Sequence, residues 1–321
     1  MSKTAINLVI CSKPLQWFNA SNIGYPDNTK RYLIIVGGFS ESEDFYKKLK
    51  EYDSNWEDVI LTGNREESCA AALKLAEQFT IEKLYVDCDY GTVGNNYAKL
   101  PAKEFYVYEE GFGPYVNLID NSLKGTLKKV AFKILGMAEF LGAHKRTNGI
   151  YVHNPAYYKS IHTRYSKKVM PFKEPFYVAL QNKDQLMDKI SSKNEAYSHL
   201  SGKRVMFYIT RYTLNEEIIR YIESQIDQFD YVIIKLHPHK FDLDISEFVK
   251  NIPENKLIVL RNSTLAEVII SKLSINNELT IVHEGSSSCL YVDERRVKVI
   301  NMDKEYNEEF TIFKKMYLET L

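Results

Sequence analysis

Residues 58–87, DVILTGNREESCAAALKLAEQFTIEKLYVD, contain the clearest alternation of predicted strand and helix in the chain. Two runs rich in β-branched and apolar residues, 58–62 and 83–87, predict strands. Between them, residues 65–79 predict an amphipathic helix, because apolar residues recur on one face and acids stand in the first turn, where the helix dipole favours them. Strand, helix and strand in this order predict a parallel sheet with helices on its faces.

The same alternation runs through both halves of the chain. In the first half, residues 6–11, 32–37 and 104–108 predict three further strands, and residues 118–141 predict a long helix. The pattern then loosens and restarts in the second half. The expected strands there are residues 204–209, 231–236, 256–260, 279–283 and 297–300, and the expected helices are residues 215–228 and 265–273.

A chain of 321 residues is long for one compact core, so two domains of about 150 residues each are expected. The predicted fold class is α/β, with two doubly wound Rossmann-like domains facing a central nucleotide-binding crevice. The first domain is expected at residues 1–165, an inter-domain region at 166–202 and the second domain at 203–305. Residues 306–321 predict a terminal helix that could pack back on the first domain.

Composition places the chain among ordinary soluble proteins, with 45% hydrophobic and 26% charged residues. Its 42 basic residues balance 42 acidic ones, which gives no bulk attraction to nucleic acid. The apolar run near the N-terminus is too short for a secretion signal or a membrane span, so a cytoplasmic protein is expected. The four cysteines are scattered without a C-x-x-C pair, which indicates reduced thiols.

Two adjacent carboxylates, Glu109 and Glu110, follow the predicted strand 104–108 and precede Gly111. Neighbouring strand residues point to opposite faces of a sheet, so one carboxylate can enter the crevice while the other is buried or bonds the loop. Burial beside a like charge raises the pKa of a carboxyl group towards that of a useful general base. The alternative is an acidic strand end that simply enters solvent.

His237 and Pro238 follow the predicted strand 231–236. Proline keeps the residue before it out of helical space, so His237 is expected to stay extended at the strand tip, where a protonated histidine could stabilise a departing phosphate. A metal site built from His237, His239 and His283 is a competing interpretation, although no Asp or Cys stands nearby at ligand spacing. A third interpretation is that His237 is an ordinary solvent-exposed histidine at the end of a strand.

Three serines, Ser286, Ser287 and Ser288, follow the predicted strand 279–283 and precede apolar residues that could begin a helix. Small residues at a helix N-terminus expose N–H groups and hydroxyls to an anion, so the run predicts a phosphate site. Ordinary capping of a helix by serine explains the same residues without a ligand.

Two further residues of the second domain could contact a nucleotide. Glu267 stands in the first turn of the predicted helix 265–273, and its carboxylate could accept hydrogen bonds from both ribose hydroxyls. An acid in the first turn of a helix also needs no ligand to explain it. Thr210 lies in the loop after the domain's first predicted strand and could add a hydroxyl near the nucleotide.

The order and spacing of these motifs resemble the bacterial sialyltransferases of GT-B type, a group that includes lipooligosaccharide, capsule and polysialic acid enzymes. That group shares two acids followed by glycine, a His-Pro pair and a serine pair, which residues 109–111, 237–238 and 286–288 match in order. Residues 13–20 look like the Thr-Pro-Leu-Gln opening of several members, with Lys13 in place of the threonine. Residues 265–269 are similar to the segment whose glutamate grips the cytidine ribose.

The resemblance implies an inverting transfer of sialic acid from CMP-sialic acid to a sugar hydroxyl of a capsule or lipooligosaccharide glycan. An inverting transfer needs a base on the acceptor hydroxyl and a stabiliser on the departing phosphate. No metal cofactor is required in principle, because the protein supplies donors for the single phosphate. The implied base is Glu109, with Glu110 as the other candidate; the implied phosphate partner is His237; the implied CMP-binding residues are Gly111, Thr210, Pro238, Glu267, Ser286, Ser287 and Ser288; and the implied acceptor-binding residues are Gln16 and Asn19.

Three other functions fit the same residues. A transferase using CMP-Kdo or a polyol-phosphate donor needs a similar site, a metal-dependent hydrolase could use the three histidines, and a noncatalytic nucleotide-binding protein of surface assembly needs no base. The acceptors of this family are often lipid-linked, so peripheral attachment to the inner face of the membrane is possible. Basic stretches such as residues 124–133 and 167–168 could provide it, although a solvated helix face explains the same lysines. The motifs carry no prediction of the acceptor sugar, the linkage or the oligomeric state.

Overall fold

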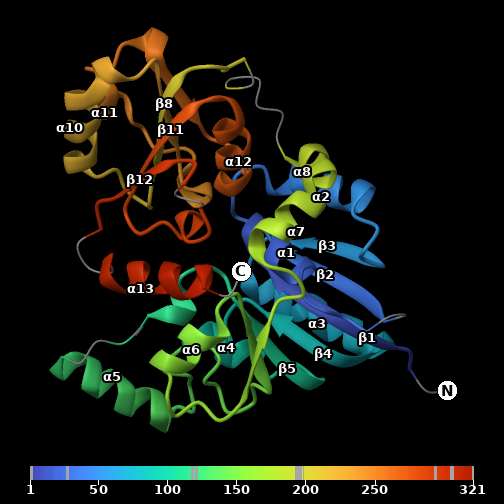
Figure 1. Cartoon of the computed structure of the whole chain (residues 1–321). Helices are drawn as coiled ribbons and strands as arrows, with labels where there is room; N and C mark the ends of the chain where they lie inside the picture. The colour runs from blue at the N-terminus through green and yellow to red at the C-terminus, as the bar shows by residue number, and fades with distance from the viewer. Residues whose placement is uncertain are drawn as a thin grey trace. The chain divides into compact units, whose positions relative to one another are not determined.

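The computed structural model divides the chain into two compact units, each built on its own sheet (Figure 1). Unit 1 consists of Met1–Gly38, Ser42–Lys183 and Lys315–Leu321. Unit 2 consists of Phe39–Glu41 and Asp184–Lys314. The residues that the structure describes are 3–26, 29–116, 119, 122–191, 197, 199–292, 295–303 and 307–319.

Unit 1 is built on a seven-stranded parallel sheet with the strand order β3-β2-β1-β4-β5-β6-β7. The order reverses between β1 and β4, which is the switch point of a doubly wound sheet. The five strands predicted in this half are confirmed. The strands are β1 Ala5–Cys11, β2 Lys30–Val36, β3 Asp58–Thr62, β4 Thr80–Val86, β5 Ala102–Tyr108, β6 Gly149–Val152 and β7 Lys168–Pro171.

The helices of unit 1 alternate with its strands. The predicted helix 65–79 is confirmed as α3, whose N-terminus is capped by the side chain of Asn64. The long helix predicted at 118–141 is wrong in length, because it ends in a turn at Gly136, whose φ of 65° favours glycine. Residues 118, 120 and 121 of that prediction lie outside the described residues. The helices are α1 Pro14–Ser21, α2 Ser42–Tyr52, α3 Arg65–Gln78, α4 Gly91–Tyr97, α5 Leu123–Ile134, α6 Pro155–Ile161 and α7 Phe176–Asn182.

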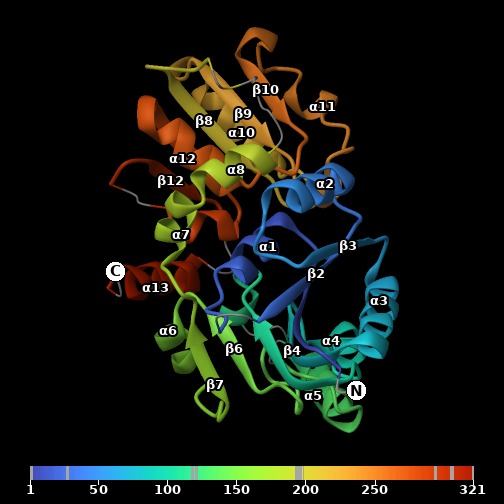
Figure 2. The same ribbon diagram turned by 90° about the vertical axis from the view of Figure 1, so that its right-hand side faces the viewer.

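Strands β6 and β7 were not expected from the sequence. Each is four residues long, and β7 forms the edge of the sheet and ends at a proline, so neither carries a long apolar run (Figure 2). A Cβ at Gly149 would lie 2.7 Å from the Lys168 carbonyl oxygen, so glycine permits the close approach of the two strands. Unit 1 therefore continues through β7 and α7 to Lys183, inside the stretch expected as an inter-domain region.

Unit 2 is built on a five-stranded parallel sheet with the strand order β10-β9-β8-β11-β12, and the five strands predicted there are confirmed. Its core includes Ile218 and Ile222 of α10, which pack against strand residues such as Met206 and Ile234. The strands are β8 Arg204–Ile209, β9 Tyr231–Lys235, β10 Leu257–Leu260, β11 Glu278–His283 and β12 Lys298–Asn301, and the helices are α8 Asp184–Ile190, α10 Glu216–Gln225, α11 Ser246–Val249, α12 Ala266–Asn276 and α13 Asn307–Leu318.

The C-terminal helix α13 contributes residues to both units. In unit 2, the ring of Phe310 lies 5.2 Å from the ring of His283. In unit 1, the hydroxyl of Tyr317 accepts a hydrogen bond from the Phe176 backbone N–H at 3.1 Å. Among the described residues, no helix combines the length and the apolar character needed to cross a membrane.

Candidate active site

In unit 1, polar residues gather where β1, β4 and β5 end. Ser12 follows β1, Asp87 follows β4, and Glu109 and Glu110 follow β5. These strands are neighbours and parallel, so their carboxyl ends lie at one edge of the sheet, beside the switch point. Doubly wound sheets bind their ligands at this place.

Glu109 is completely buried and holds the local backbone together. Its Oε2 accepts hydrogen bonds from the Tyr115 hydroxyl and, at 2.7 Å, from the backbone N–H of His153. Its carbonyl oxygen accepts the Asn19 amide at 2.9 Å. The Glu109 carboxylate therefore ties the end of β5 to the loop after it and to the end of β6.

Glu110 lies in different surroundings, as strand alternation predicts. Its side chain is 30% exposed, and its Oε2 accepts a hydrogen bond from the Gln16 amide at 3.0 Å and lies 3.8 Å from the Lys13 ammonium. The pKa of Glu110 is raised, chiefly because the surrounding protein displaces water, and Asp87 adds to the shift while Lys13 and Arg65 oppose it. A carboxylate that reaches solvent with a raised pKa is suited to accept a proton.

The two residues expected to bind the acceptor, Gln16 and Asn19, are buried and bond within unit 1. The side-chain oxygen of Gln16 accepts hydrogen bonds from the backbone N–H and the hydroxyl of Ser12. These bonds turn the side-chain NH₂ group of Gln16 towards Glu110. Asn19 joins the Glu109 carbonyl to the His153 ring. Contact of either residue with an acceptor stays a prediction.

An ion pair beside this cluster was not identified from the sequence. Asp87 is fully buried, and both of its oxygens accept hydrogen bonds from the Arg65 guanidinium, at 2.7 and 3.0 Å. Ser12 donates to Asp87 at 3.1 Å. Arg65 begins α3 and Asp87 follows β4. The feature of the sequence that could have identified this pair is the acid directly after a strand, near the switch point of the sheet.

Gly111 gives the chain its turn after the two glutamates. Its φ of 142° lies in the region that favours glycine, and a side chain there would be strained. The turn leads the chain from β5 towards Tyr115, whose hydroxyl returns to Glu109.

In unit 2, His237 lies just beyond β9 in an extended conformation, as the following proline predicts. Its backbone N–H donates to the Thr210 hydroxyl at 3.0 Å, and its Nδ1 accepts the His239 backbone N–H at 3.2 Å. An accepting Nδ1 leaves the proton of the neutral ring on Nε2. The ring packs on Tyr212, with ring centroids 4.3 Å apart, so Thr210 and Tyr212 fix its position.

Glu267 forms a buried polar group with Lys235. The Lys235 ammonium donates to the Asn262 carbonyl at 2.6 Å, and burial lowers the pKa of Lys235 to about 8, although Glu267 opposes the shift. Burial also raises the pKa of Glu267, while a hydrogen bond from Ser288 acts against that. Within the described part of the chain, Oε1 of Glu267 and Oγ1 of Thr264 have no hydrogen-bond partner. Buried polar atoms without partners are rare, and a ligand hydroxyl or a water molecule could supply the missing hydrogen bonds here.

The three serines lie at the carboxyl end of β11, and all three are half-buried. The apolar residues after them could begin a helix, but over Ser287–Cys289 the chain forms a 3₁₀ turn, and no α-helix follows in the described residues up to 292. The Ser286 backbone N–H donates to His283 Nδ1 at 3.0 Å. Gly285 precedes them with a φ of 64°, and a Cβ there would lie 2.3 Å from the Asp303 carboxylate, so only glycine fits.

The described residues contain no group of three His, Cys, Asp or Glu side chains that could hold a metal ion. His237 and His239 have ring centroids 5.5 Å apart, and His283 is fully buried with its pKa lowered to about 3 by burial. The three histidines that the sequence allowed as ligands therefore do not form such a group.

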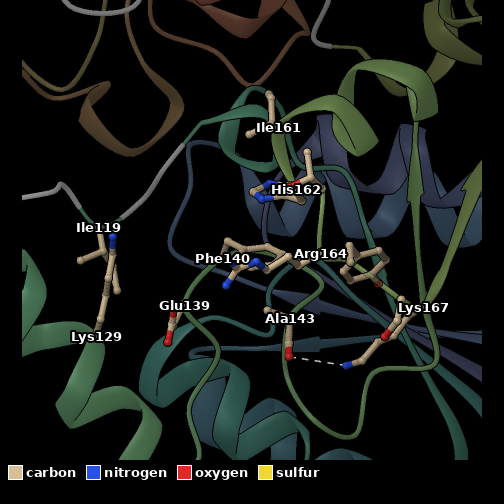
Figure 3. Close-up of a pocket in the computed structure, with 12 residues that line it drawn as sticks. Ile119, Lys129, Glu139, Phe140, Ala143, Ile161, His162, Arg164 and Lys167 are labelled. Carbon is tan, nitrogen blue, oxygen red and sulfur yellow. Dashed lines mark hydrogen bonds between the residues drawn. The ribbon is translucent and has the colours of Figure 1, made fainter.

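A pocket of about 440 Å³ lies in unit 1, lined by residues around α5, α6 and the segments before β6 and β7. In Figure 3, Ile119 and Lys129 form one side, and His162, Arg164 and Lys167 form the other. None of the residues predicted from the sequence as site residues lines it. The pocket and the Glu110 cluster are therefore separate features of unit 1.

Two doubly wound parallel units define the GT-B fold, and comparison with solved structures agrees with it. The chain is similar to the UDP-GlcNAc 2-epimerase of Methanocaldococcus jannaschii, with a TM-score of 0.57 and 12% identity over 98% of this chain and 93% of that one. It is similar to the wall teichoic acid polymerase TagF, with a TM-score of 0.51 and 11% identity over 98% and 84%. No protein-family model and no curated protein sequence matches the chain.

Proposed function

We propose that this protein is an inverting sialyltransferase that moves sialic acid from CMP-sialic acid to a sugar hydroxyl of a cell-surface glycan. The observation that carries the proposal is the Glu110 carboxylate, which reaches solvent at the carboxyl end of β5 while Glu109 beside it is buried. The resemblance of the acid pair, His-Pro and serine motifs to bacterial sialyltransferases supplies the substrate class.

Glu110 is assigned as the base that takes the proton from the acceptor hydroxyl. Its raised pKa makes it a better proton acceptor than an ordinary surface carboxylate, and Gln16 orients it through a hydrogen bond. Glu109, which the resemblance alone favours, has its carboxylate engaged by Tyr115 and His153. Its assigned role is to position the loop that carries Glu110.

His237 and the serines are assigned to the departing CMP. The Nε2 proton of His237 would bond a phosphate oxygen and stabilise the charge that develops as the sugar leaves. Ser288 already bonds Glu267, so Ser286 and Ser287 are the serine pair assigned to the phosphate. Thr210 and Pro238 hold His237 extended.

Glu267 and Thr264 are assigned to the ribose. Oε1 of Glu267 and Oγ1 of Thr264 are buried without a partner in the described residues, and ribose hydroxyls would supply the missing hydrogen bonds. The positive charge of Lys235 stabilises the ionised carboxylate of Glu267 and so lowers its pKa, against the effect of burial.

The similar structures support a nucleotide-sugar donor as a class. The Methanocaldococcus jannaschii enzyme was solved with UDP-GlcNAc and UDP, and TagF was soaked with CDPG. At 11–12% identity these structures share the fold, and the choice of CMP-sialic acid rests on the motifs.

A donor comparison tests the proposal. Purified protein is incubated with CMP-sialic acid, CMP-Kdo, CDP-glycerol or UDP-GlcNAc, with and without EDTA, and the released nucleotide is measured. We expect CMP release from CMP-sialic acid that EDTA does not reduce. Turnover of CMP-Kdo or CDP-glycerol alone would assign the alternative transferase, chelator-sensitive turnover would assign a metal enzyme, and binding of CMP without any turnover would assign a noncatalytic protein.

A further inference from the structure

Helix α5 exposes a continuous apolar stripe. Leu123, Leu127, Val130 and Ile134 are 79%, 63%, 51% and 79% exposed. Their spacing of four, three and four residues places them on one face of the helix. A stripe of four large apolar side chains is unusual on the surface of a protein and indicates a binding face.

The opposite face of α5 packs against the rest of unit 1. Gly125 is buried, Lys129 and Phe132 are half-buried, and the Phe132 ring lies 5.4 Å from the ring of Tyr90. A helix turns about 100° per residue, so these three residues share one side and the apolar stripe is centred on the other. The usual arrangement of a surface helix, apolar inside and polar outside, is therefore inverted here.

Lysines flank the stripe, and α5 contains no acidic residue. By the same helical geometry, Lys124 and Lys133 lie along the two borders of the stripe. Lys128 lies nearer the covered face, where its ammonium is 5.6 Å from the centre of the Tyr90 ring and 5.4 Å from that of Phe132. The three side chains are exposed, although the whole chain has a net charge of zero. The positive charge is therefore a local property of this helix.

Further cations line the pocket of Figure 3, which meets α5 on its covered side at Lys129. Lys129 comes from α5, and Arg164 and Lys167 face the same pocket, whereas the lining contains one acid, Glu139. Apolar and cationic side chains thus occur together, which matches a partner that offers both an apolar layer and negative charge.

We propose that α5 is an interfacial helix that seats unit 1 on a membrane surface bearing anionic lipid head groups. The stripe enters the boundary between head groups and acyl chains, and the lysines extend from its borders to the lipid phosphates. With twelve residues, α5 is about 18 Å long, which is too short to span a bilayer. A second copy is a poorer partner, because a symmetric contact between two such helices would bring lysines against lysines.

Vesicle sedimentation with the full chain tests the proposal and needs no catalytic activity, so its outcome is independent of the proposed function. Vesicles of phosphatidylcholine alone are compared with vesicles that also contain phosphatidylglycerol. We expect wild-type protein to sediment with the anionic vesicles and to be released by raised salt.

Two sets of variants separate the apolar and charged contributions. Leu127→Gln with Ile134→Gln should lower vesicle binding more than tenfold, because two large apolar side chains no longer enter the membrane boundary. Lys124→Gln, Lys128→Gln and Lys133→Gln together should remove the preference for anionic vesicles. All five side chains are exposed, so the melting temperature should change by only a few degrees, with the loss of the contact between Lys128 and the rings of Tyr90 and Phe132 as the main cause. The matched controls are Leu73→Gln with Ile275→Gln, which are exposed apolar residues elsewhere, and Lys47→Gln with Lys74→Gln and Lys203→Gln.

Three results would overturn the proposal. The first is wild-type protein that stays in the supernatant with anionic vesicles. The second is equal loss of binding in the α5 variants and their controls. The third is a concentration-dependent dimer in sedimentation velocity that Ile134→Gln abolishes while vesicle binding is absent, which would assign the stripe to a second copy.

Discussion

Glu109 and Glu110 are adjacent in the chain, but their carboxylates lie in different surroundings. The Glu109 carboxylate accepts two hydrogen bonds from its own unit, whereas the Glu110 carboxylate is held by Gln16 and Lys13 and reaches solvent. A glutamine at either position keeps the size of the side chain and removes its negative charge. The pair of substitutions therefore separates a reacting carboxylate from a structural one.

We predict that Glu110→Gln lowers kcat for transfer by about 10²–10⁴-fold, which is the usual contribution of a general base, and leaves the melting temperature nearly unchanged. Glu109→Gln should lower the free energy of unfolding by about 1–3 kcal/mol, because a buried acceptor is replaced by an amide that suits its partners less well. Steady-state kinetics and thermal melting of both variants check this. The reverse pattern, with Glu109→Gln stable and inactive and Glu110→Gln active, would return the base to Glu109.

Two buried histidines make stability depend on pH. Burial lowers the pKa of His153 and of His283 to about 3, against an ordinary value near 6.5. Between these values the unfolded chain binds a proton that the folded chain does not, so stability falls as the pH falls from 6.5 towards 3. Each histidine contributes about 1.4 kcal/mol per pH unit to this loss.

The location of the tryptophans allows the two histidines to be distinguished. Both tryptophans, Trp17 and Trp56, belong to unit 1, as His153 does, whereas His283 belongs to unit 2. We predict that His153→Gln flattens the pH dependence of urea unfolding followed by tryptophan fluorescence between pH 7 and 5. His283→Asn should leave that fluorescence curve unchanged, and equal flattening by both variants would contradict the assignment.

At the scale of elements, helix α4 depends on glycine at one contact. A Cβ at Gly94 would lie 1.8 Å from the carbonyl carbon of Asp89, which no relaxation of a side chain can relieve. We predict that Gly94→Ala lowers the free energy of unfolding by more than about 3 kcal/mol, measured by urea unfolding with tryptophan fluorescence. Gly24→Ala is the control, because nothing lies within 4 Å of its Cβ, and it should change stability by less than about 0.5 kcal/mol. Equal stability of the two variants would show that α4 shifts to accept the methyl group.

Long apolar runs were predicted well, and short elements were not. Five strands of unit 1 and five of unit 2 follow from runs of β-branched and apolar residues that parallel, doubly covered strands require. Strands β6 and β7 are short, and β7 has half-exposed and exposed side chains, so they lack that signal. A serine run before apolar residues can precede either a helix or a single 3₁₀ turn, and at Ser287–Cys289 the chain forms the turn.

At the scale of the whole molecule, the sequence predicted which strand ends carry polar residues, but it did not predict how those residues bond. The acid pair, His237 and the serines each follow a strand, as expected. The hydrogen bond from Gln16 to Glu110 and the Arg65–Asp87 ion pair join residues far apart in the chain, and no local pattern encodes such contacts. Likewise, the exposed stripe of α5 has the spacing of an ordinary buried face, and only the fold shows which side of the helix is covered.

In the proposed reaction, Glu110 of unit 1 would act as the base, and residues of unit 2 would contact the phosphate and the ribose. The most direct test is the identity of the product that wild-type protein forms from CMP-sialic acid and a glycan acceptor in EDTA, determined by NMR. We predict one sialoside with anomeric configuration opposite to that of the donor, and CMP in equal amount. A product of retained configuration, or no sialoside with any acceptor while another nucleotide sugar is consumed, would contradict it.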